Sequence, residues 1–148
     1  MFQVWVEESF AAGHALRGYR GKCENVHGHN YKVRVTLEGT GLNRIGLLCD
    51  FKELKDAIHS SIRKLDHQFI NDVPPFDVLN PSAENLAKYF HDEVTRLLAA
   101  APASSGERRR ADSTLTLISC AELLRSTTNC HSMPSSGKVR STRSMAVG

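Results

Sequence analysis

The chain has 148 residues, of which 41% are hydrophobic and 24% charged, a length and composition typical of one folded globular domain. Its net charge of +3 comes from residues 101–148, because residues 1–100 carry 12 Lys and Arg against 13 Asp and Glu, so no nucleic-acid-binding face is expected. The sequence also lacks an apolar run of about 18 residues, a signal peptide and any CxxC pair, so we expect a cytoplasmic protein that does not cross a membrane.

The first predicted element is a strand over residues 2–14. Because successive strand residues point to opposite faces, its even positions form one face. Apart from Glu8, these are Phe2, Val4, Val6, Phe10, Ala12 and His14. Glu7 and Glu8 interrupt the pattern, and the strand could carry a β-bulge at Glu8. The predicted buried face therefore ends on a histidine.

A second strand is predicted over residues 27–38. Its odd positions form the apolar face, which consists of His27, His29, Tyr31, Val33, Val35 and Leu37. The even positions are polar from Asn30 onward. Antiparallel pairing with the first strand would bring His14 to the same end of the sheet as His27 and His29.

These three histidines are a candidate metal site. Neutral imidazole is a common zinc ligand, and three such ligands leave one tetrahedral position open, as in catalytic zinc sites. We therefore expect His14, His27 and His29 to bind zinc. The zinc ion would act as a Lewis acid on bound oxygen. The alternative is that His14 is only a structural residue at the end of its strand.

Cys23, in the loop between the strands, could complete or assist such a site. It could be a fourth zinc ligand that closes a structural site, or a base or nucleophile beside the metal. The nearby cations Arg17, Arg20 and Lys22 favour its thiolate form and could also meet an anionic substrate. Cys49 lies in an apolar run and is expected to be a core residue.

An amphipathic helix is predicted next, beginning near Asp50, which forms a capping box with Glu53. Its apolar positions are Phe51, Leu54, Ile58, Ile62 and Leu65. Asp66 and His67 end this helix, and an acid beside an imidazole could relay a proton. Adjacent residues on a helix do not face each other, which argues against that role.

A second helix is predicted from residue 81 or 82, with Asn80 or Ser82 as its N-cap and Glu84 as a partner of the helix dipole. Its apolar face would be Ala83, Leu86, Ala87, Phe90, Val94 and Leu97. Two strands followed by two one-faced helices predict an α+β fold, with both helices on one face of an antiparallel sheet.

The composition changes after residue 101. Residues 102–148 are rich in Ser and Arg and poor in large apolar side chains, so we expect this segment to be partly flexible. Weak alternation within residues 112–124 could add a final strand to the domain formed by residues 1–101.

Five motifs in order, FAAGHAL, CENVHGH, DFKELK, LDHQFIND and NPSAENLAKY, resemble the 6-pyruvoyl-tetrahydropterin synthase family. CENVHGH in particular resembles the bacterial branch of that family, the 6-carboxy-5,6,7,8-tetrahydropterin synthases of queuosine biosynthesis. The resemblance implies the tunnelling fold (T-fold), in which a four-stranded antiparallel sheet carries two helices. It further implies that three subunits close a barrel and that two trimers stack into a homohexamer.

The resemblance also implies roles for individual residues. The three histidines would bind zinc, which holds the side-chain hydroxyls of 7,8-dihydroneopterin triphosphate. Cys23 would be the general base, and His67, supported by Asp66, would be the partner acid/base. Ser82 and Ala83 occupy the segment that holds the pterin ring. The implied activity is that of a lyase that releases triphosphate and acetaldehyde to form 6-carboxytetrahydropterin.

One departure from the family concerns its final strand. That strand carries a glutamate that binds the pterin, followed by a threonine and, further on, a tyrosine. Here no Thr directly follows Glu122, and no Tyr lies further along the chain. Either Glu122 substitutes in a shifted register, or the chain is a catalytically impaired zinc-binding relative. A 6-pyruvoyl product in place of the 6-carboxy product also remains open.

Overall fold

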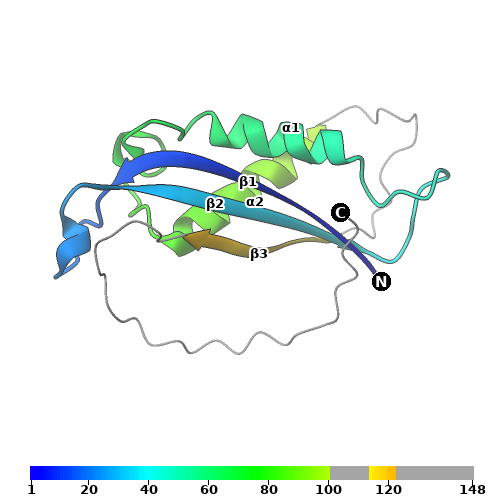
Figure 1. Ribbon diagram of the computed structural model, residues 1–148, viewed down its shortest axis with the longest axis horizontal. Helices are drawn as coiled ribbons and strands as arrows, with labels where there is room; N and C mark the ends of the chain where they lie inside the picture. Colours follow the sequence, from blue (N-terminus) through cyan, green and yellow to red (C-terminus); the bar gives the residue numbers. More distant parts are fainter. Residues whose placement is uncertain (101–113, 123–148) are drawn as a thin grey trace.

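The computed structural model describes residues 1–100 and the backbone of 114–122. Three strands, β1 (Phe2–His14), β2 (His27–Gly39) and β3 (Thr114–Glu122), form an antiparallel sheet in that order. In Figure 1 the strands run side by side, and α1 and α2 lie over the sheet. The predicted α+β fold, an antiparallel sheet with two helices, is confirmed.

The pairing of β1 with β2 is continuous from Phe2 opposite Gly39 to His14 opposite His27. The register does not shift at Glu8, so the predicted bulge there is wrong. Glu8 instead keeps its place on the core-facing side of β1, and its carboxylate lies 3.6 Å from Lys55 Nζ. A charged residue is tolerated at this position because a cation of the neighbouring helix accompanies it.

The core lies between this face of the sheet and the helices. Even positions of β1 stand opposite odd positions of β2, so the apolar residues of both strands share one face. Its buried members are Val6, Phe10, Ala12, Tyr31, Val33, Val35 and Leu37. The rings of Phe10 and Tyr31 stack with centroids 4.9 Å apart, and Phe10 also contacts Phe90 of the second helix.

The first helix, α1 (Phe51–Ile62), is shorter than its sequence pattern suggests. Asp50 caps it by accepting a hydrogen bond from the Lys52 backbone at 2.8 Å. Phe51 was expected on the apolar face but is 48% exposed, so the packed face starts one turn later, at Leu54.

The second helix, α2 (Ala83–Ala100), begins directly after Ser82, whose hydroxyl accepts a hydrogen bond from the Asn85 backbone at 3.3 Å. Its buried residues are Leu86, Phe90, Val94 and Leu98. Ala83, predicted on the apolar face, is exposed, because it forms the first turn of the helix. Among the described residues, no helix is both long and apolar enough to cross a bilayer.

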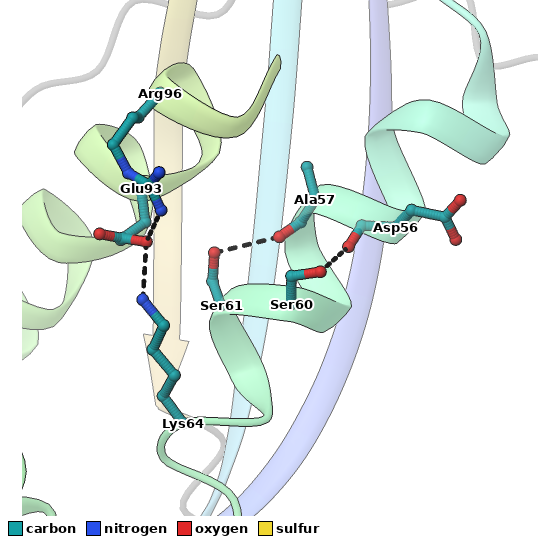
Figure 2. Close-up of polar contacts among 7 residues, drawn as sticks. All are labelled: Asp56, Ala57, Ser60, Ser61, Lys64, Glu93 and Arg96. Atoms are coloured by element: carbon teal, nitrogen blue, oxygen red, sulfur yellow. Dashed lines mark hydrogen bonds and ion pairs between the residues drawn. The ribbon is translucent and has the colours of Figure 1, made fainter. Parts of the chain in front are cut away.

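A polar contact joins the two helices on the solvent side of the core. Figure 2 shows that one oxygen of Glu93, on α2, accepts from Lys64, just beyond α1, at 3.0 Å and from Arg96 at 2.8 Å. The neighbouring Ser60 and Ser61 satisfy their hydroxyls on backbone carbonyls of α1. These bonds supplement the apolar packing of the helix pair.

The resemblance implies four strands, whereas the described part of the chain forms three. Apart from β3, the segment 102–148 lies outside the described residues. The division of the chain into 1–101 and 102–148 stays a prediction.

Candidate metal centre

Three histidines converge at one end of the sheet, as the strand parity predicts. His14 is the last residue of β1 and pairs with His27, the first residue of β2, while His29 follows on the same face. One ring nitrogen from each lies within 4.8 Å of the others. The Nε2 atoms of His14 and His27 are 3.1 Å apart. The three rings therefore point at one common position.

Backbone carbonyls fix the tautomers of two of these rings. His14 Nδ1 lies 2.9 Å from the Pro81 carbonyl oxygen, and His27 Nδ1 lies 2.7 Å from that of Asn25. A carbonyl only accepts, so each Nδ1 carries the proton and each Nε2 presents a lone pair. Two lone pairs that face each other at 3.1 Å repel unless a cation lies near both. This donor set fits a metal ion such as zinc.

Burial keeps the His14 imidazole in the neutral form that binds metal. His14 is only 6% exposed, and this desolvation lowers its pKa to about 4, against the opposing effect of the Pro81 carbonyl. The neighbouring imidazoles of His27 and His29 lower it further. His14 is therefore neutral near pH 7, which is the state of a histidine ligand.

Cys23 lies in a short 3-10 helix, η1 (Lys22–Glu24), and is half-buried. Its backbone carbonyl accepts a hydrogen bond from Leu16 at 2.9 Å. Within the described residues, the cluster of potential ligand atoms consists of the three histidines and does not include Cys23. This geometry favours an open three-histidine site over one closed by the cysteine.

Asp66 and His67 lie beyond α1, which ends at Ile62, so the expectation that they end the helix is wrong. His67 has a φ of 57°, an uncommon value for a residue other than glycine. Outside a helix the two side chains can meet, and Asp66 Oδ1 lies 2.9 Å from His67 Nδ1. The objection that adjacent helical residues face apart therefore does not apply.

Asp66 and His67 form a turn, called the Asp66 turn below, which is attached to β1 near its histidine end. The His67 backbone donates to the Ala11 carbonyl at 2.7 Å, and the Ala11 N–H donates to Asp66 Oδ1 at 3.1 Å. Gly13 donates in turn to the Gln68 carbonyl at 3.0 Å. The hydrogen bond from the Ala11 N–H, together with the side-chain contact to His67, holds the pKa of Asp66 below its ordinary value. Asp66 is thus an anion that orients His67.

The candidate substrate residues lie near the same end of the sheet. Ser82 and Ala83 directly follow Pro81, whose carbonyl binds His14. The backbone of Glu122 pairs with Tyr31, two residues beyond His29 on β2. The structure therefore places the chain segments of all three candidates close to the histidine cluster.

Sequence patterns did not reveal the contacts of three polar residues beside the cluster. Asn71 and Asn80 bind the backbone of the segment that follows His14, and neither showed more than a turn or capping preference. Arg17, considered for an anionic substrate, donates instead to the backbone carbonyls of Asn71, Phe76 and Leu79. No local pattern could reveal these contacts, because each partner is more than 50 residues away in the chain.

Comparison with known proteins gives a family for this arrangement. The family model for 6-pyruvoyl tetrahydropterin synthase matches residues 3–126. The match runs from β1 through β3 and thus includes the histidine cluster, Cys23, the Asp66 turn and Glu122.

Individual relatives agree with that match. The Haemophilus influenzae 6-carboxy-5,6,7,8-tetrahydropterin synthase is 39% identical over 77 residues, which cover 49% of this chain and 54% of that protein. The 6-pyruvoyl tetrahydrobiopterin synthase of Poecilia reticulata is 37% identical, over 63% of this chain and 73% of that protein. The structure of Caenorhabditis elegans 6-pyruvoyl tetrahydropterin synthase superposes with a TM-score of 0.59 at 28% identity, over 64% of this chain and 77% of that one.

Proposed function

This chain belongs to the 6-pyruvoyl tetrahydropterin synthase family, and on that premise we propose that it is a cytoplasmic, zinc-dependent 6-carboxy-5,6,7,8-tetrahydropterin synthase. The proposed reaction converts 7,8-dihydroneopterin triphosphate to 6-carboxytetrahydropterin with loss of triphosphate and acetaldehyde. Its product would enter queuosine biosynthesis. The tetrahydropterin synthase character rests on the family, and the particular substrate and product are our proposal.

The observation that carries the proposal is the histidine cluster, with its ligand nitrogens within 4.8 Å of one another. His14, His27 and His29 would hold the ion, and their three nitrogens leave a coordination position for substrate. Zinc bound there would act as a Lewis acid on the side-chain hydroxyls of the substrate.

Proton transfer would fall to two groups supplied by different segments. Cys23, in the loop between β1 and β2, would act as the general base on the substrate side chain. His67 would be the partner acid/base, oriented by the Asp66 carboxylate at 2.9 Å. The position of Asp66 is itself set by the Ala11 N–H. Support for the assignment of His67 comes from the hydrogen bonds that attach the Asp66 turn to β1.

The pterin ring would be held by the segment at the start of α2 and by the last strand. Ser82 and Ala83 would bind the ring edge, next to the Pro81 carbonyl that receives the His14 proton. Glu122 would accept hydrogen bonds from the pterin amidine. The pairing of Glu122 with Tyr31 supports this role, because it brings that strand end to the histidine side of the sheet.

The nature of the product distinguishes two activities in the family. Relatives named for the 6-carboxy and 6-pyruvoyl products match this chain at 39% and 37% identity, so identity alone does not separate them. A third possibility is a relative that binds zinc but does not turn over. It is favoured by the absence of a Thr directly after Glu122 and of a Tyr further along the chain.

One assay tests all three. Protein loaded with zinc is incubated with 7,8-dihydroneopterin triphosphate, and the pterin products are identified by mass spectrometry. We expect 6-carboxytetrahydropterin together with acetaldehyde and triphosphate. Formation of 6-pyruvoyltetrahydropterin would assign the other activity of the family. Bound zinc and bound pterin without turnover would identify an impaired relative.

We further propose that the enzyme acts as a homo-oligomer, a trimer or a hexamer. In the described sheet β2 is central, so β1 and β3 are edge strands, and the edge of β1 before Ala11, where the Asp66 turn does not bind it, and that of β3 would pair with another subunit. Light scattering after size-exclusion chromatography gives the mass of the assembly. A monomer at micromolar concentration would contradict the proposal.

A further inference from the structure

Two asparagine side chains bind the segment that follows β1 as a neighbouring strand would. Asn71 Oδ1 accepts from the Ala15 N–H at 2.9 Å, and Asn71 Nδ2 donates to the Ala15 carbonyl at 2.8 Å. Asn80 repeats this pattern on Arg17, at 2.8 and 2.9 Å. Ala15 and Arg17 are two residues apart, which is the spacing at which one edge of an extended segment presents its backbone groups. We call these four hydrogen bonds the amide clamp.

The Arg17 side chain reinforces the amide clamp from the same side. Its guanidinium donates to the carbonyls of Asn71, Phe76 and Leu79 at 3.0, 2.8 and 3.2 Å. These carbonyls belong to the loop that connects the Asp66 turn with α2. The segment after β1 and this loop are therefore joined by seven hydrogen bonds, from Asn71, Asn80 and Arg17.

The amide clamp is adjacent to both partners of a hydrogen bond in the metal site. Ala15 directly follows His14, and Asn80 directly precedes Pro81, whose carbonyl accepts the His14 Nδ1 proton at 2.9 Å. The clamp thus fixes the position of the His14 backbone relative to the carbonyl that orients its ring. Between the clamped residues, Leu16 donates from the opposite edge to the Cys23 carbonyl at 2.9 Å.

We propose that Asn71 and Asn80 are positioning residues of the metal centre, which aim His14 Nε2 at the common position of the three histidines. They act without touching the ion, because they fix the ligand and its carbonyl partner at once. Loss of such outer contacts commonly lowers metal affinity by about 10- to 100-fold. The inference rests on the proposed metal site at His14, His27 and His29.

The variants Asn71→Ala and Asn80→Ala each remove two hydrogen bonds of the clamp. Asn43→Ala is the matched control, because Asn43 Oδ1 also accepts two backbone hydrogen bonds, from Ile45 and Leu47, but lies beyond the opposite end of β2. Zinc affinity is measured by competition with a chelating dye, and the melting temperature is measured on metal-free protein. The visible spectrum of the Co²⁺-loaded protein reports the geometry of the ligands.

We expect both clamp variants to bind zinc about 10-fold or more weakly than the wild type and to alter the Co²⁺ spectrum. Asn43→Ala should lower the melting temperature without either change. Wild-type zinc affinity and spectrum in folded clamp variants would overturn the inference, and so would an equal loss of affinity in Asn43→Ala. Asn80 is less buried than Asn71, so Asn80→Ala serves if Asn71→Ala does not fold. Absence of zinc binding in the wild type would instead refute the proposed metal site.

Discussion

At the scale of single residues, the proposed metal centre depends on hydrogen bonds that set the tautomers of its candidate ligands. The Pro81 and Asn25 carbonyls take the Nδ1 protons of His14 and His27, which leaves Nε2 of each ring for the ion. His29 completes the set from the same face of β2. Each ligand is therefore needed for tight binding, since two imidazoles alone hold zinc far less firmly.

The variant His29→Ala tests this dependence. We expect the wild type to retain about one zinc per chain, as one three-histidine site requires, and His29→Ala to lose it on dialysis against a mild chelator. Metal content is measured by mass spectrometry of the digested protein. His91→Ala, a half-buried position near the middle of α2, is the control and should retain zinc. Stoichiometric zinc in a variant with both His27 and His29 replaced by Ala would contradict the site.

The variant Cys23→Ala separates metal binding from proton transfer. We expect it to bind zinc like the wild type and to lose turnover by at least about 100-fold, the contribution typical of a general base. Cys49→Ala, which changes a buried thiol of the core, is the control and should keep both properties. Loss of zinc from Cys23→Ala would show that the sulfur is a ligand and would favour the closed structural site.

At the scale of elements, the two helices are held together by apolar packing and by the Glu93 contact shown in Figure 2. Hydrogen bonds from Arg96 and Lys64 lower the pKa of Glu93 below its ordinary value. The folded state thus favours the charged carboxylate. This stabilisation is complete above the unfolded-state pKa and is lost as the pH falls through the folded-state pKa.

The variant Glu93→Gln should therefore be less stable than the wild type near neutral pH by less than about 1 kcal/mol, because the contact is partly exposed. The difference should shrink toward zero in acid, where Glu93 is protonated in both states. Urea unfolding followed by circular dichroism at several pH values measures it. A difference that is constant from neutral to acid pH would show that charge does not cause the effect.

At the scale of the whole molecule, the proposed pterin binding depends on how the last strand completes the sheet. β3 pairs with β2, which brings Glu122 opposite Tyr31 at the histidine end. The family match includes this strand. If Glu122 takes the place of the family glutamate, its charge is needed to hold the pterin amidine, in this subunit or in a neighbouring one.

We expect Glu122→Gln to bind pterin about 10- to 100-fold more weakly, which corresponds to roughly 1.4 to 2.8 kcal/mol for the lost charged hydrogen bond. Pterin affinity is measured by fluorescence titration, and zinc content and oligomer mass are measured on the same sample. Zinc content and oligomer mass should equal those of the wild type, because the proposal gives Glu122 no role in zinc binding or in assembly. Unchanged pterin affinity would assign the amidine contact to another residue or leave it unfilled.

The sequence alone was enough to predict the strands, the helices and the convergence of the histidines. These features depend on local periodicity: alternation places His27 and His29 on the face of Val33 and Val35, and the spacing of Leu86, Phe90 and Val94 marks one face of a helix. Because an antiparallel pair joins the end of one strand to the start of the next, His14 had to meet His27 once both strands were recognised.

The tertiary structure decided what surrounds those histidines. The contact of Asp66 with His67 requires a left-handed turn that is held in place by Ala11, and the sequence pattern suggested a helix there instead. The amide clamp and the Pro81 carbonyl likewise join segments more than 50 residues apart. Asparagine and proline have the same local turn preferences wherever they occur, so only the packing of these segments against β1 determines which backbone groups they meet.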